Sequence, residues 1–211
     1  RKFKDPYVID KSVAYADLTQ AAPDIWIKDF TLTPEFCKSV IQRYDNFEGK
    51  VPGRVGHGEY RPGVKDSLDM HISSQPEWHD VDKVLFSVLK ESADEITDDL
   101  SAINSEMTDY FTNDTGYNMQ KTVPGGKYIW HQEIGPGNVV NYNRSLTFMW
   151  YMNEDFEGGD TGFVRQGVQV EAKTGRLVLF APFWTHIHSG FPVTDGEKYI
   201  ITGWFHQGEI T

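Results

Sequence analysis

The pattern of hydrophobic and polar positions divides the chain into a helical first half and a strand-rich second half. Thr33-Pro34 is a typical helix start, with threonine as N-cap and proline in the first turn. Ser74 and Glu77 have the spacing of a capping box, which predicts a second, longer helix. Its apolar stripe consists of Val81, Val84, Leu85, Val88, Leu89, Ile96 and Leu100.

From residue 116 onward the hydrophobic period changes to two, which is typical of strands. The candidate strands are 117–123, 127–133, 145–152, 160–164, 167–172, 175–181, 186–191 and 198–206. Helices followed by many short strands predict a mainly β fold with flanking α-helices. The expected architecture is a double-stranded β-helix (jelly-roll) core backed by the N-terminal helices.

A chain of 211 residues is predicted to form a single domain, 1–211. Residues 1–24 are expected to be an irregular arm, 25–115 a helical support, and 116–207 the jelly-roll catalytic core. Residues 49–63 hold five glycines and two prolines, which predict a mobile loop. This loop is either a lid over a substrate or a disordered insertion.

Charge and composition exclude several classes of partner. The formal net charge is −11, which argues against duplex nucleic acid or an anionic membrane, because both require a basic surface. No apolar run approaches the roughly 18 residues of a membrane span, and we expect a cytoplasmic protein. The single cysteine, Cys37, rules out an intrachain disulfide framework and a multi-cysteine zinc site.

His131 and Glu133 are the first candidates for chemistry. Residues i and i+2 of a strand point to the same face, so these two side chains could offer a nitrogen and an oxygen to one ion. A second histidine would complete a two-histidine, one-carboxylate triad, the site of oxygen-activating iron(II) enzymes. The pair alone is weak evidence, because His-x-Glu often arises by chance, and it fits better a surface strand with a solvated glutamate and a histidine that bonds a carbonyl.

The C-terminal segment offers two such histidines, His186 and His188, which are predicted on the same face of one strand. Lys198 follows inside the apolar segment KYIITGWF. An inward lysine is costly unless it meets an anion. Alternatively, Lys198 lies at the start of its strand and reaches water.

The segment 117–207 resembles the prolyl 4-hydroxylase branch of the Fe(II)/2-oxoglutarate-dependent oxygenases. The family's motif positions are matched by Gly125, Tyr128, His131, Glu133, Gly158-Gly159-Asp160-Thr161, His188, Pro192-Val193 and Lys198. His186 fits none of these spacings, so His188 is the preferred ligand. The resemblance implies Fe(II) on His131, Glu133 and His188, although such a triad also accepts manganese, cobalt or nickel.

The same resemblance implies the co-substrates and the reaction. Lys198 is expected to hold the distal carboxylate of 2-oxoglutarate, with the Thr161 hydroxyl beside it. O2 is the second co-substrate, and ascorbate is the expected reductant. The family couples oxidative decarboxylation of 2-oxoglutarate to hydroxylation of a substrate C–H bond. A cupin-type metalloenzyme that does not use 2-oxoglutarate would leave Lys198 without a role.

Two positions depart from the family pattern. Glu133 stands where the family usually has aspartate, which retains the carboxylate. Thr122 stands where a tyrosine commonly reaches 2-oxoglutarate, and threonine is too short for that contact. These departures keep open a catalytically silent jelly-roll module that binds a ligand or a partner protein.

Tyr128, Arg144 and Trp204 resemble the substrate-facing residues of prolyl 4-hydroxylases. Two aromatic rings and a guanidinium suit a proline ring whose carbonyl accepts hydrogen bonds. The expected substrate is therefore a proline-containing peptide or protein. The same chemistry on a free amino acid or small metabolite is the alternative, and each of the three residues could instead serve only packing.

Overall fold

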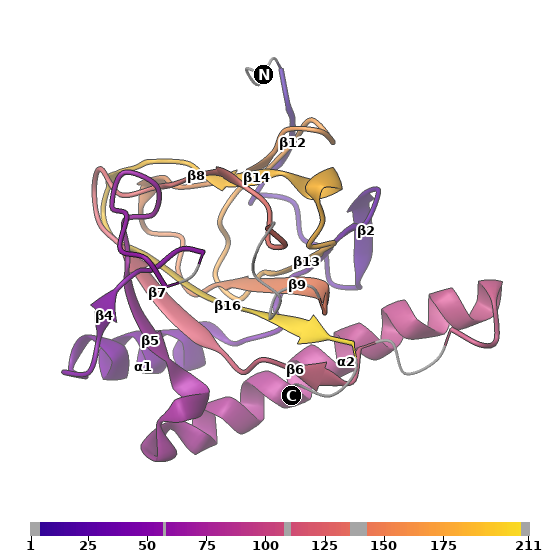
Figure 1. Cartoon of the computed structure of the whole chain (residues 1–211), viewed down its shortest axis with the longest axis horizontal. Helices are drawn as coiled ribbons and strands as arrows, with labels where there is room; N and C mark the ends of the chain where they lie inside the picture. The colour runs from indigo at the N-terminus through magenta and orange to yellow at the C-terminus, as the bar shows by residue number, and fades with distance from the viewer. Residues whose placement is uncertain (1–4, 57, 108–110, 136–142, 208–211) are drawn as a thin grey trace.

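The computed structural model describes residues 5–56, 58–107, 111–135 and 143–207, and within them two β-sheets face one another with two helices outside the larger sheet (Figure 1). The larger sheet has the order β2 (Thr19–Ala22), β3 (Ile25–Lys28), β13 (Leu177–Phe180), β9 (Arg144–Tyr151), β16 (Lys198–His206), β7 (Asn118–Thr122), β5 (Leu68–His71) and β4 (Val51–Pro52), with β6 (Asn113–Asp114) paired to β16.

The smaller sheet carries the strands that approach the candidate metal ligands. Its order is β1 (Tyr7–Ile9), β12 (Val168–Val170), β11 (Thr161–Phe163), β14 (His188–Gly190) and β8 (Tyr128–His131). A separate pair joins β10 (Glu157–Gly158) to β15 (Val193–Asp195). All pairs are antiparallel except β1 with β12. This double-sheet arrangement confirms the predicted jelly roll.

The two helices cover the outer face of the larger sheet (Figure 1). Helix α1 (Pro34–Asp45) begins as predicted, because the Thr33 hydroxyl accepts a hydrogen bond from the amide of Phe36. Helix α2 (His79–Ile103) buries Val81, Leu85, Leu89 and Ile96 against the sheet. Val84, which was expected in this stripe, is 40% exposed.

The predicted capping box at Ser74 is wrong. Two 3-10 turns, Ile72–Ser74 and Pro76–Trp78, precede α2, which begins only at His79 and has no side-chain cap. The Ser74 hydroxyl instead bonds Nδ1 of His71, at 2.7 Å. The residue between the turns is extended, so the chain bends where continuous helix was expected.

The glycine-rich segment 49–63 also contains order. It holds β4 and a bridge between Val55 and Glu59, whereas its His57 lies outside the described residues. The N-terminal arm is likewise less irregular than predicted, since the described part of it contributes β1 and β2 to the two sheets. Within the described residues, no helix has both the length and the apolar character to cross a membrane.

A buried arginine, paired with Asp29, fixes the N-terminal arm to the jelly roll. Arg176 is fully buried, and its Nε donates to Oδ1 of Asp29 at 2.7 Å. Its Nη2 donates to Oδ2 of Asp29 at 3.1 Å, and Nη1 and Nη2 also donate to the backbone carbonyls of Ile9, Asp10, Val13 and Glu171. Burial is the largest single influence and raises the pKa of Asp29, but the hydrogen bonds from Arg176 and the Tyr15 amide, with the charges of Arg176 and Lys173, together outweigh it and lower that pKa.

We expect Arg176→Met to lower the free energy of unfolding by about 3–5 kcal/mol, because it removes the buried partner of both Asp29 oxygens. The carboxylate then keeps only Lys173, at 3.5 Å, and the amide of Tyr15. Chemical denaturation of the variant at neutral pH measures this loss. The matched control is Lys90→Met, which removes the exposed Lys90–Asp94 pair and should cost less than about 1 kcal/mol. Equal effects of the two substitutions would contradict a structural role for Arg176.

Candidate active site

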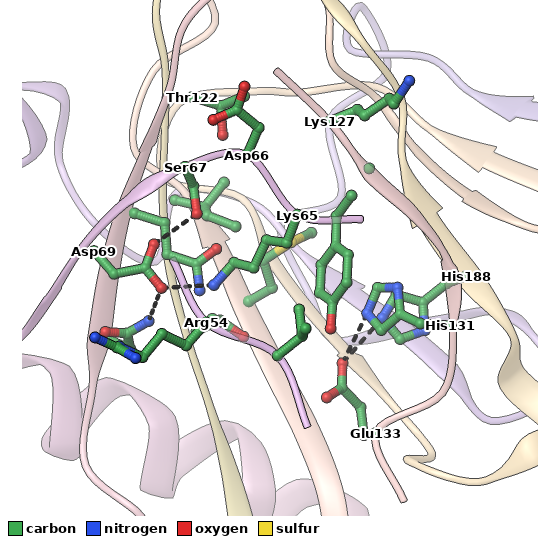
Figure 2. Close-up of a pocket in the computed structure, with 18 of the residues that line it drawn as sticks. Arg54, Lys65, Asp66, Ser67, Asp69, Thr122, Lys127, His131, Glu133 and His188 are labelled. Carbon is green, nitrogen blue, oxygen red and sulfur yellow. Dashed lines mark hydrogen bonds and ion pairs between the residues drawn. The ribbon is translucent and has the colours of Figure 1, made fainter. Parts of the chain in front are cut away.

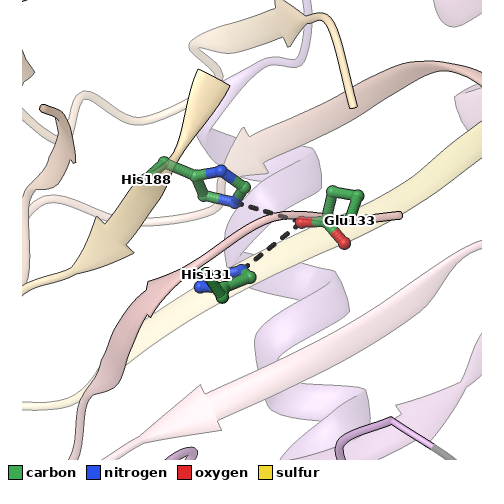
Figure 3. A group of neighbouring side chains, drawn as sticks. All are labelled: His131, Glu133 and His188. Atoms are coloured by element: carbon green, nitrogen blue, oxygen red, sulfur yellow. Dashed lines mark ion pairs between the residues drawn. The ribbon is translucent and has the colours of Figure 1, made fainter. Parts of the chain in front are cut away.

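The three predicted metal ligands converge at one edge of the smaller sheet (Figure 3). Antiparallel pairing of β14 with β8 places His188 directly opposite His131. Glu133 lies just beyond β8, and its Oε1 is 3.5 Å from Nε2 of His131 and 3.0 Å from Nε2 of His188. One potential ligand atom from each residue lies within 4.8 Å of the others.

Backbone carbonyls fix both imidazole rings. Nδ1 of His131 is 2.7 Å from the carbonyl oxygen of Ile129, and Nδ1 of His188 is 2.9 Å from that of His186. A carbonyl oxygen only accepts, so each Nδ1 carries the hydrogen and Nε2 is the atom turned toward Glu133. Metal-binding histidines are typically held in this way, with one ring N–H donated to a carbonyl and the other nitrogen free to bind the ion. The donor set, two imidazole nitrogens and one carboxylate, therefore fits an iron(II) ion.

The electrostatics of the cluster also suit a cation. Burial by itself raises the pKa of Glu133, but hydrogen bonds and charge from His131 and His188 hold that pKa well below its usual value. Burial and the neighbouring His188 lower the pKa of His131. An ionised carboxylate beside an imidazole that resists protonation is the state in which these groups bind a metal.

His186 does not join the cluster. It was expected on the same strand face as His188, but it lies in a 3-10 turn, Trp184–His186, and only His188 belongs to β14. Its Nδ1 bonds the Thr185 hydroxyl at 2.9 Å, and its Nε2 bonds the carbonyl oxygen of Pro23 at 3.0 Å. The change from strand to turn separates the two rings, so His186 ties the N-terminal arm to the core.

Lys198 and Thr161 line the same cavity as the three candidate ligands. Lys198 is 5% exposed, which excludes the alternative that it reaches water, and its Nζ donates to the carbonyl oxygen of Gly159. Burial lowers the pKa of Lys198 to about 8, against a smaller opposing effect of Asp160. A buried ammonium with donors to spare is suited to an anion.

Two neighbours shape the surroundings of Lys198. Thr122, which stands where the family commonly has a tyrosine, lies directly opposite Lys198 on the adjacent strand β7. Tyr151 was not predicted as a site residue, because its position in an apolar strand carries no distinguishing signal. Its hydroxyl lies 2.6 Å from the Thr161 hydroxyl, and its ring centroid is 5.3 Å from Nζ of Lys198.

The three predicted substrate residues also border the cavity. The Tyr128 ring stacks on His131 with 3.5 Å between centroids. Arg144 donates to the backbone oxygen of Glu133 at 2.6 Å, and its guanidinium carbon lies 3.5 Å from the centroid of the Trp204 ring. The structure thus brings together all eight residues singled out for metal, co-substrate and substrate.

The cavity has a volume of about 560 Å³ and extends away from the metal cluster between the two sheets. Its far wall contains residues that were not predicted from the sequence, above all Lys65 and Asp69 (Figure 2). Asp69 lies in the short strand β5 and Lys65 three residues before it. A lysine and an aspartate four residues apart match no sequence motif for a binding site. Arg54, from the predicted loop, borders the same space.

A jelly roll with two histidines and one carboxylate at the edge of one sheet defines a class of non-haem metal site. Residues 117–206 match the model of the 2OG-Fe(II) oxygenase superfamily. A protein of Acanthamoeba polyphaga mimivirus, provisionally named as a prolyl 4-hydroxylase, is 35% identical over 76 residues. The matched segment covers 32% of this chain and 31% of that relative.

Solved prolyl hydroxylases share the fold over most of their length. A Trichoplax adhaerens prolyl hydroxylase in complex with a hypoxia inducible factor peptide fragment has a TM-score of 0.69 at 19% identity, covering 87% of this chain and 83% of that one. A Pseudomonas putida prolyl-4-hydroxylase has a TM-score of 0.66 at 20% identity, covering 87% of this chain and 93% of that one. These comparisons confirm the resemblance to the 2OG-Fe(II) oxygenase superfamily, prolyl 4-hydroxylase-like branch, that the sequence predicted.

Proposed function

We propose that this chain is an Fe(II)- and 2-oxoglutarate-dependent dioxygenase that hydroxylates a peptidyl proline. The observation that carries the proposal is the convergence, in one cavity, of the His131, Glu133 and His188 donor atoms with the buried ammonium of Lys198. A metal site alone would fit many enzymes. A buried cation beside it selects a co-substrate with a carboxylate.

In this proposal the three ligands hold Fe(II), and Lys198 with Thr161 binds the distal carboxylate of 2-oxoglutarate. Bound iron, 2-oxoglutarate and O2 supply the oxidising chemistry, with succinate and carbon dioxide as co-products and ascorbate as external reductant. The protein's own residues orient the reactants. The carbonyls of Ile129 and His186 keep both imidazole rings in place, and Tyr151 holds the Thr161 hydroxyl.

The substrate assignment rests on Tyr128, Arg144 and Trp204. Tyr128 and Trp204 offer aromatic faces, and Arg144 offers N–H donors at the metal end of the cavity. A proline ring packs on aromatic side chains, and its carbonyl accepts hydrogen bonds. One solved relative of similar fold is bound to a peptide fragment, which favours a peptide over a free metabolite. We place this activity in the cytoplasm.

The test is succinate release with Fe(II), ascorbate and 2-oxoglutarate, with and without proline-rich peptides, followed by mass analysis of the peptides. We expect succinate to rise with peptide and one peptide to gain a single oxygen atom. Slow succinate release without any oxidised peptide would preserve the oxygenase and refute the substrate. Bound iron without any succinate would favour a silent binding module.

A further inference from the structure

A second polar cluster lies across the cavity from the metal ligands and is used by neither iron nor 2-oxoglutarate in the proposed function. Lys65 and Asp69 are both buried, and Nζ of Lys65 donates to Oδ2 of Asp69 at 2.6 Å. In Figure 2, Lys65 lies between Asp69 on one side and the group of His131, Glu133 and His188 on the other. The pair therefore faces the space in which a substrate must bind.

The backbone ties Lys65 to the strand that carries the first metal ligand. The carbonyl of Val64 accepts from the amide of Ile129 at 3.0 Å, and the amide of Asp66 donates to the carbonyl of Lys127 at 2.9 Å. Lys65 consequently pairs with Tyr128. Its Nζ is 5.9 Å from the centroid of the Tyr128 ring, and that ring stacks on His131. The ammonium is thus separated from the candidate metal site by one aromatic ring.

Asp69 is held as rigidly as Lys65. Its carboxylate accepts from the Ser67 hydroxyl at 2.7 Å and from the Asn118 amide at 3.2 Å. The segment that contains Gly53 packs against Ser67: a Cβ at Gly53 would lie 2.4 Å from Oγ of Ser67, so a larger residue would displace the hydroxyl that donates to Asp69. Asp69 thereby positions Lys65, and Gly53 brings the following residue, Arg54, to the cavity wall.

The charge of the cavity is opposite to that of the chain. Acidic residues outnumber basic ones by 31 to 20 in the whole sequence. Among the described residues that line the cavity the balance is reversed, with basic Arg54, Lys65, Lys127, Arg144 and Lys198 against acidic Asp66, Asp69 and Glu133. Lys198 is assigned to 2-oxoglutarate, and Glu133 to the metal. The part of the cavity left for the substrate therefore remains basic, which favours an anion.

We propose that Lys65, together with Arg54, binds a carboxylate of the substrate, and that the hydroxylated molecule carries this acidic group near the oxidised C–H bond. The inference rests on the proposed oxygenase function and specifies its substrate class. An ammonium has three N–H donors. Within the described residues, Nζ of Lys65 donates one side-chain hydrogen bond, to Asp69, so donors remain for a ligand.

Binding to the whole chain, loaded with Mn(II) and 2-oxoglutarate and kept free of O2, tests this inference by calorimetry. The first pair of probes is L-proline and L-prolinamide. The second is a blocked peptide with proline flanked by glutamates and its counterpart with glutamines. We expect the acidic member of one pair to bind about tenfold more tightly or better than its amide twin. The responsive pair then shows whether the carboxylate belongs to a free amino acid or to an acidic side chain.

The variant Lys65→Met should abolish this preference for the acid. Because it leaves Asp69 buried and unpaired, the double variant Lys65→Met/Asp69→Leu provides a second measurement without an isolated charge. The matched control is Lys127→Met, a lysine exposed on the cavity wall, which should retain the preference.

The absence of an acid preference in both pairs, including no measurable binding of either acid, overturns the inference. Persistence of the preference in both Lys65 variants overturns it as well. Succinate formed without substrate is measured in a separate assay in the presence of O2, because it requires iron, 2-oxoglutarate and O2 but not the carboxylate site. If the parent chain forms no succinate, the proposed function itself fails. If succinate forms but no acid preference exists, only the carboxylate site is refuted.

Discussion

His188→Ala is expected to reduce iron-dependent succinate formation by more than about a hundredfold, because substitutions that merely disturb the support of a metal ligand already cost about 10–100-fold. Nε2 of His188 lies 3.0 Å from Glu133, and its Nδ1 is fixed by a backbone carbonyl. Removal of the ring leaves one imidazole and one carboxylate, which are too few to hold the ion. Metal content after dialysis and succinate release measure the two effects.

The matched control is His186→Ala, two residues earlier in the chain. His186 is also buried, but its ring bonds Thr185 and Pro23 and has no part in the cluster. We expect this variant to lose about 1–3 kcal/mol of stability while it retains bound iron and turnover at a temperature where it is folded. Loss of iron from the His186 variant with full retention by the His188 variant would refute the ligand assignment.

The second large effect is expected at Lys198. Lys198→Met removes a buried cation while keeping a side chain of similar length, and we expect the 2-oxoglutarate requirement to rise by about a hundredfold or more. This follows from the 2–5 kcal/mol that truncation of one partner of a buried charge pair typically costs. Iron binding should be unchanged, since Lys198 is not among the three ligands. Titration of 2-oxoglutarate against the Mn(II)-loaded protein measures the affinity.

Lys198 also predicts how this affinity depends on pH. Burial lowers its pKa to about 8, so the group is charged below that pH and neutral above it. Only the ammonium attracts a carboxylate, hence the affinity for 2-oxoglutarate should fall as pH rises above about 8. The limiting slope is about tenfold per pH unit. The Lys198→Met variant should lack this dependence, and Lys127→Met should keep it. A slope that survives in Lys198→Met would assign the titration to another group.

Local pattern was sufficient to predict much of the fold. Strand β16 runs from Lys198 to His206 as the alternation indicated, and α1 begins after Thr33 because its hydroxyl caps the first turn. The spacing of His131 and Glu133 likewise predicted that their side chains point to the same site, and they do so although β8 itself ends at His131. These features depend on residues close together in the sequence, where periodicity and capping chemistry act directly.

The features that the sequence did not predict depend on contacts between distant segments. The Ser74 hydroxyl bonds His71 because two tight turns intervene before α2. The N-terminal arm is held by Arg176, which donates to the carbonyls of Ile9 and Val13 across 167 and 163 residues of chain. Hydrophobic periodicity and capping patterns describe neighbouring residues only, so they do not predict a hydrogen-bond partner from a distant segment.

The site follows the same division. The sequence by itself determined which residues could form the metal triad and that a lysine follows ten residues after its second histidine. The family spacing already favoured His188 over His186, and the structure places the ring of His188 against Glu133. Only the tertiary structure decided that Lys198 is buried and that Lys65 and Asp69 form the opposite wall. The reason is physical: the direction and burial of a side chain are set by the strand register and by the surfaces packed around it.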